Sequence, residues 1–167
     1  CCYHQHLMYN VGLLMARGRA VCIMDSDALV SEGFVSAVVD GVDRGGRVAL
    51  HLDEVRNNDP RFHPYADCPL DEVTGPGCVN WLDGRPLGLL DRADPLHTRN
   101  YGACLAARRA DLLAIGAADM HRDFVGHVCG PYDMTFRLAA AGVSERWHPS
   151  EWLYHVWHPG QAGDRNY

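Results

Sequence analysis

Apolar residues in the first half of the chain follow two alternating patterns. A helical spacing comes first, at Leu7, Met8, Val11, Leu14 and Met15. Residues 20–24 then form a short apolar run of strand length. A second helix, which Ser31 can cap, presents one apolar face made of Phe34, Val35, Val38, Val39 and Val42. A second apolar run covers residues 48–52. This alternation predicts an α/β fold, three layers deep, with a mostly parallel sheet.

The second half begins with a less regular segment. Prolines interrupt every long element between residues 53 and 100, which we interpret as a loop-rich insertion rather than a separate domain. Regular patterns then return, and they predict a strand over 101–107, a helix over 109–115, a helix from Pro131 to Gly142, and a last strand over 151–157.

Composition narrows the function classes. The chain has 167 residues, 47% of them hydrophobic and 22% charged, as expected for one globular domain. A net charge of −6 argues against a nucleic-acid surface, and no apolar run approaches the ~20 residues of a membrane span. All 15 basic residues are Arg, so sites that require a lysine are excluded.

Cysteine usage and the ends of the chain give two further expectations. The seven cysteines include no C-x-x-C pair, which favours a reducing, cytoplasmic location over a disulfide framework. The chain opens on Cys1 without an initiator Met, so we expect it to be a fragment of a longer protein.

Two carboxylates follow the first predicted strand, in the sequence Asp25-Ser26-Asp27. In open α/β sheets, ligands collect at the carboxyl ends of strands. Carboxylates together with phosphate oxygens and water are the ligands that Mg²⁺ and Mn²⁺ prefer. The pair therefore fits a clamp for a metal and a diphosphate. A plain turn is the alternative, because Asp and Ser are also common turn residues.

Three segments resemble GT-A-fold glycosyltransferases, especially the large family-2-like group. The first is "YNVGLLMARGRAVCIMDSDALVSEGFVSAVV", in which the matching positions are Asn10, Gly12, Ala16, Gly18, Asp25 and Asp27. The second, "YGACLAARRADLLAIGAADM", resembles the family's later strand and helix. The third, "CGPYDMTFRLAAAG", resembles its acidic helix. The likeness covers most of the chain outside residues 53–100.

The resemblance implies a Rossmann-like GT-A sandwich, of which residues 1–167 would form one partial domain without the N-terminal elements that hold the nucleotide base. It implies transfer of a sugar from a nucleotide-sugar donor to an acceptor hydroxyl, with inversion and with Mn²⁺ or Mg²⁺. Donor binding would involve Asn10, Asp25 and Asp27, and Asp27 would be the more direct metal ligand. The acceptor, whether a glycan, a lipid-linked group or a protein, stays open.

Asp133 is the candidate catalytic base, because a base must deprotonate the acceptor hydroxyl. The match has two possible registers. In one, Gly130 and Pro131 replace the family's Glu-Asp pair and the usual base is missing. In the other, Asp133 is the base and the register of Arg137 slips by two. A structural role is also open, since Asp133 lies in a helix's first turn with Arg137 four residues on.

His155 and His158 end the last predicted strand and are candidates for a further metal ligand, which several metal-dependent GT-A enzymes supply from this region. We therefore expect at least one of the two rings to lie beside the D-x-D acids. Packed or hydrogen-bonded histidines are the alternative interpretation.

Two rival functions follow from the same residues. A phosphatase of the haloacid-dehalogenase type also begins with an apolar strand and D-x-D. It needs a lysine, or occasionally an arginine, and a late acidic pair, and the chain has no lysine and no such pair late in the sequence. The acidic motif around Asp133 departs from the family's pattern, which leaves a second alternative, a non-catalytic transferase-like domain that binds a sugar or a nucleotide sugar.

Overall fold

The structure is a computed structural model that describes residues 4–44, 46–57, 61, 71, 78–82, 85–87, 101–124, 130–156 and 158. The four longest helical elements are α1 (Gln5–Met15), α2 (Phe34–Asp43), α4 (Arg109–Ala114) and α5 (Gly130–Ala140), with a short 3-10 turn at Arg122–Phe124. None of the helices in these ranges is both long and apolar enough to cross a bilayer.

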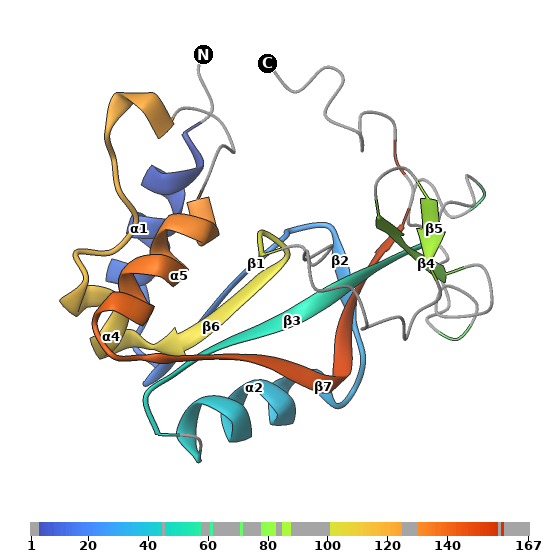
Figure 1. Ribbon diagram of the computed structural model, residues 1–167, viewed down its shortest axis with the longest axis horizontal. Helices are drawn as coiled ribbons and strands as arrows, with labels where there is room; N and C mark the ends of the chain where they lie inside the picture. The colour runs from blue at the N-terminus through green and yellow to red at the C-terminus, as the bar shows by residue number, and fades with distance from the viewer. Residues whose placement is uncertain are drawn as a thin grey trace.

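The described strands form one seven-stranded sheet (Figure 1). They are β1 (Ala20–Met24), β2 (Ala28–Val30), β3 (Val48–Asn57), β4 (Cys78–Leu82), β5 (Arg85–Leu87), β6 (Cys104–Arg108) and β7 (Ser144–Val156). The main path runs β1-β6-β3-β4-β5, and β7 lies between β3 and β2 in a branch off this path.

The expected mostly parallel, Rossmann-like GT-A sheet is wrong. β3 and β7 run parallel, but the other five pairings between described strands are antiparallel. Four of the five residues of β6 are buried. Such a strand has the same apolar pattern whichever way it runs, so the periodicity of the sequence could not predict its direction. The strand before Asp25 is also not central: among the described strands, β1 pairs with β6 alone and ends the path.

Helices cover both faces of the sheet (Figure 1). On one face, Leu13 of α1, Leu112 of α4 and Leu138 of α5 pack in one buried cluster with sheet residues. On the other, the buried residues Phe34, Val38 and Val42 of α2 share a cluster with β3 and β6. Each cluster removes apolar surface from water, which is the main stabilising contribution to such a fold.

Helix α1 buries a different side from the one that its apolar spacing indicated. Its buried residues are His6 and Leu13. The apolar stripe is exposed, and its members are Leu7, Met8, Val11, Leu14 and Met15. The spacing therefore predicted the helix correctly. The side that carries His6 and Leu13 faces the sheet, and the apolar stripe does not.

Several element boundaries differ from the predicted ones. Strand β7 begins at Ser144, seven residues earlier than expected, and continues through Pro149, with a register shift against β3 between His51 and Asp53. Irregularity of this kind lets a proline lie within a strand. Strands also occur within residues 53–100, where β3 continues to Asn57 and β4 and β5 form an antiparallel pair.

Candidate metal centre

The structure brings together the side chains of Asp27, His155 and His158. Oδ2 of Asp27 lies 3.2 Å from Nε2 of His155 and 3.2 Å from Nε2 of His158. The ligand atoms of all three residues lie within 4.8 Å of one another. The expectation that a C-terminal histidine lies beside the D-x-D acids is confirmed for both rings; their role as metal ligands stays a prediction.

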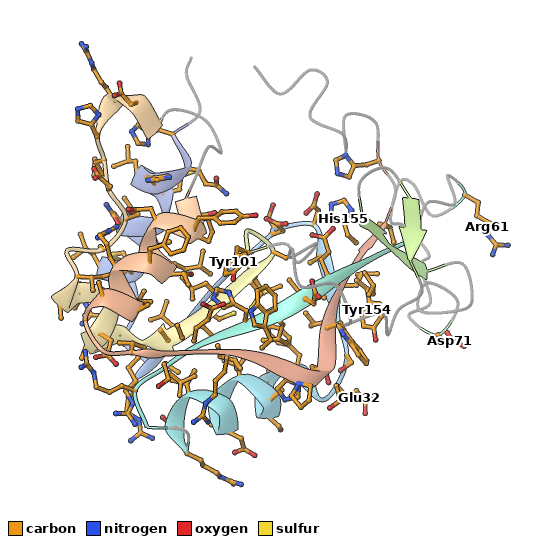
Figure 2. All side chains as sticks on the ribbon, viewed as in Figure 1. Glu32, Arg61, Asp71, Tyr101, Tyr154 and His155 are labelled. Carbon is orange, nitrogen blue, oxygen red and sulfur yellow. The ribbon has the colours of Figure 1, made fainter. Side chains whose placement is uncertain are left out.

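Strand pairing brings these distant residues together. β2 begins directly after the Asp25–Asp27 turn and runs antiparallel to the end of β7, with Ala28 opposite His155 and Val30 opposite Leu153. Asp27 therefore stands one residue before the position that faces His155. Figure 2 shows His155 at this end of β7, beside β2. His155 is buried, whereas Asp27 and His158 are partly exposed, so the group opens to solvent on the side of these two residues.

The spacing of the three groups fits a shared cation. Metal bonds of ~2.1 Å at angles of ~90–110° place neighbouring ligand atoms ~3.0–3.4 Å apart. The two nitrogen–oxygen distances of 3.2 Å fall in that range. Two imidazoles and one carboxylate form a mixed set, which suits Mn²⁺ better than Mg²⁺, because Mg²⁺ binds chiefly oxygen ligands.

A simple His–Asp ion pair is the alternative explanation of the same distances. Charge-assisted N–H···O⁻ bonds are usually ~2.7–2.9 Å long, and both contacts of Asp27 exceed this. Nδ1 of His155 is buried and makes no hydrogen bond with any described residue. Packing rather than hydrogen bonding at Nδ1 thus orients the His155 ring toward Asp27.

Asp25 lies on the inner side of the same turn. Its backbone N–H donates to the carbonyl of Ala103, at 3.1 Å, and so fixes the start of the turn to the segment before β6. The hydrogen bond with Cys22 and burial raise the pKa of Cys104, and the charge of Asp25 adds to this. Asp25 is therefore close to the sheet, and the three-residue metal group contains Asp27 and not Asp25.

Asn10 has a structural role that the sequence analysis did not predict. Its Nδ2 donates to the carbonyl of Ala118 at 2.9 Å, and its Oδ1 accepts from the Ala118 N–H at 2.8 Å. These two bonds hold the turn after α4, in which Ala117 adopts the left-handed conformation that disfavours most side chains. The donor-binding role of Asn10 stays a prediction.

Asp133 is bonded to Arg137. The guanidinium donates through Nε at 3.0 Å and also through Nη2, both times to Oδ2, while Nη1 donates to the Ile115 carbonyl. This is the structural pairing that the i, i+4 spacing allowed. Arg137 and Asn10 also line an open pocket of about 390 Å³. The site candidates therefore fall into two groups that share no residue in the described contacts. The catalytic role of Asp133 stays a prediction.

Sequence reasoning missed an aromatic cluster made of His51, Tyr101, Tyr132 and Trp147, in which His51 of β3 lies opposite Trp147 of β7. The His51 ring stacks on Trp147, with centroids 4.7 Å apart, and meets Tyr101 edge-on at 5.0 Å. Tyr101 lies 4.8 Å from Tyr132. Trp147 lies in β7 (Ser144–Val156), whereas the sequence pattern began the last strand only at residue 151.

Two pKa shifts occur within this cluster. Burial lowers the pKa of His51, although a hydrogen bond to the Cys104 carbonyl and the charge of Glu145 oppose the shift. Burial, followed by the hydrogen bond to Glu145, raises the pKa of Tyr101 to about 12. Around neutral pH, His51 is therefore uncharged, and the Tyr101 hydroxyl keeps its proton.

Comparison of the chain with protein-family models and with curated proteins found no match in either set.

Proposed function

We propose that this chain is part of a metal-dependent glycosyltransferase that moves a sugar from a nucleotide-sugar donor to an acceptor hydroxyl. The observation that supports the proposal best is the convergence of Asp27, His155 and His158 on one point. The three residues come from two segments far apart in the sequence, the D-x-D turn and the end of the last strand.

The chain's own residues would act as follows. Asp27, His155 and His158 would hold one Mn²⁺, and the partly exposed side of the group, at Asp27 and His158, would face the donor. When bound, such an ion supplies positive charge beside a departing diphosphate. The Ala103 carbonyl holds the Asp25 N–H, so the turn keeps its shape before any ligand arrives, which lowers the cost of binding.

Asp133 is the residue proposed to take the acceptor proton. Both bonds from Arg137 go to Oδ2, so Oδ1 makes no hydrogen bond among the described residues and can accept a proton. The inversion of configuration that we propose requires this base to act on the face of the sugar opposite the diphosphate.

A non-catalytic domain that binds a nucleotide sugar is the second candidate. The ion pair between Asp133 and Arg137 favours it, because a carboxylate that is held by a guanidinium stabilises a helix without any catalytic role.

The experiment measures nucleoside diphosphate released from UDP-glucose, UDP-N-acetylglucosamine and GDP-mannose, with Mn²⁺ and with EDTA. We expect Mn²⁺-dependent release from at least one donor. Asp27→Asn should lower it by at least about 100-fold, since it removes the negative charge of a proposed ligand. Asp40→Asn is the matched control, because it removes one negative charge from an exposed position on α2.

Three outcomes are informative. Release that is equal in Mn²⁺ and EDTA would contradict the metal role. Binding of a donor without release would favour the second candidate. Equal losses in the Asp27 and Asp40 variants would show that only general charge matters.

A further inference from the structure

The aromatic cluster lies next to the D-x-D turn. Tyr101 is two residues before Ala103, whose carbonyl holds the Asp25 N–H. Tyr132 comes from the first turn of α5 and packs against Tyr101. Figure 2 shows Tyr101 beside α5, to the left of His155 in that view. The cluster and the candidate metal centre therefore lie at the same end of β1.

The cluster is buried at its base and open at its outer ring. His51 is completely buried, with Nδ1 3.1 Å from the Cys104 carbonyl and Nε2 3.3 Å from Oγ1 of Thr135. Tyr132 is 42% exposed. A flat ring that is supported from below and open above is a surface on which another ring can stack.

A carboxylate borders the aromatic rings. Oε1 of Glu145 accepts from the Tyr101 hydroxyl at 2.8 Å and from Nε1 of Trp147 at 3.0 Å. Both ring donors are thereby oriented. Glu145 is exposed, and its Oε2 makes no hydrogen bond or ion pair with a described residue. This oxygen can accept hydrogen bonds from a ligand.

We propose that the aromatic cluster and Glu145 form the subsite for a carbohydrate acceptor, with one sugar ring stacked on Tyr132 and its hydroxyls donating to Glu145. The inference rests on the proposed function, and it names the class of acceptor for the same site.

The chemistry of the subsite favours a neutral sugar over other acceptors. A sugar presents apolar C–H faces to aromatic rings and hydroxyl donors at its rim, and both are matched here. An anionic acceptor would be repelled by Glu145. An acyl chain would gain apolar contact but would desolvate that carboxylate without any hydrogen bond in return.

The test is calorimetric binding of cellotetraose, maltotetraose and chitotetraose to the full chain. We expect at least one of them to bind. Tyr132→Ala should weaken that binding about three- to tenfold, the range expected for loss of one aromatic contact. Tyr132→Phe should restore most of it, and Glu145→Gln should weaken it. Phe136→Ala is the matched control, because Phe136 is an exposed aromatic one turn further along α5, 66% accessible.

Failure of this inference is distinguishable from failure of the proposed function. If none of the tetrasaccharides binds, or if Tyr132→Ala and Phe136→Ala have equal effects, the subsite is overturned. Mn²⁺-dependent donor release that persists in Tyr132→Ala would leave the proposed function standing in that case. Tetrasaccharide binding that depends on Tyr132, without any donor release, would support the subsite and contradict the transferase.

Discussion

His51 is the most tightly enclosed titratable side chain of the aromatic cluster. Its two ring nitrogens contact the Cys104 carbonyl and the Thr135 hydroxyl, and the charged group facing it is Glu145. Because the Cys104 oxygen can only accept, Nδ1 carries the proton in the neutral ring. The single hydroxyl proton of Thr135 has two possible acceptors, the Pro131 carbonyl at 2.8 Å and Nε2 of His51 at 3.3 Å. Through this hydroxyl, His51 connects β3 to the first turn of α5.

The lowered pKa of His51 predicts acid sensitivity of the fold. The folded-state pKa lies below the ordinary value of about 6.5, so below that pH the unfolded state binds a proton that the folded state does not. This contribution to stability is complete above about pH 6.5 and is lost as the pH falls toward the folded-state pKa. The slope is at most ~1.4 kcal/mol per pH unit for one group.

The measurement is urea unfolding at about pH 7.5 and about pH 5.5. His51→Asn, which keeps an N–H donor near Cys104, should lose less free energy of unfolding between the two pH values than the wild type does. His121→Asn replaces an exposed histidine and should follow the wild type. Identical pH dependence in all three proteins would contradict the role given to His51.

At the scale of the elements, α2 packs unusually close to the sheet through a glycine. A Cβ placed on Gly41 would lie 2.6 Å from Cδ2 of Leu50, which is buried on β3. Gly12 in α1 is the opposite case, since a Cβ there would meet nothing within 4 Å. The two glycines test packing and helix propensity separately.

Gly41→Ala and Gly12→Ala should change stability in opposite directions. Alanine is favoured over glycine in a helix by ~0.5–1 kcal/mol. Gly12→Ala should therefore stabilise the protein by about that amount. Overpacking costs ~1–3 kcal/mol, so Gly41→Ala should be net destabilising by ~0.5–2 kcal/mol.

Chemical denaturation of each variant gives the two values, and adding Leu50→Val to Gly41→Ala tests the cause. The double variant should lose less stability than the two single changes would predict by addition. If Gly41→Ala stabilises as much as Gly12→Ala does, α2 is not held against Leu50 as closely as described.

At the scale of the whole molecule, the candidate metal centre joins segments from the two ends of the chain. Asp27 precedes β2, and His155 and His158 come from the end of β7. A ligand that binds only the folded state stabilises it by ~2.7 kcal/mol at a concentration 100-fold above its Kd. For a protein of this size, that corresponds to a rise in Tm of roughly 5–10 °C.

Thermal unfolding with and without Mn²⁺ measures this coupling without any activity assay. The wild type should show the rise in Tm, whereas Asp27→Asn and His158→Ala should lose it. His121→Ala should keep the rise, because its ring lies at an exposed position away from the three ligands. A rise of the same size in Asp27→Asn would place the bound ion elsewhere.

The sequence by itself determined the local elements and the residues worth following. Residues 20–24 form the strand β1 as predicted. The Asp25–Asp27 turn follows this strand, and His155 and His158 lie at the end of β7, as the sequence pattern indicated. These features depend on neighbouring residues: an apolar run of five favours a strand, and Gly142, with a φ of +78°, ends α5 near the predicted residue.

The tertiary structure alone decided strand direction, the edge position of β1 and the partners of each polar side chain. An apolar pattern indicates which positions are buried but not the direction of the strand. The antiparallel pairing of β1 with β6 could therefore not be predicted from the sequence. The contact of Asp27 with His155 depends on the β2–β7 register. Contacts of this kind arise from long-range packing, which no short stretch of sequence encodes.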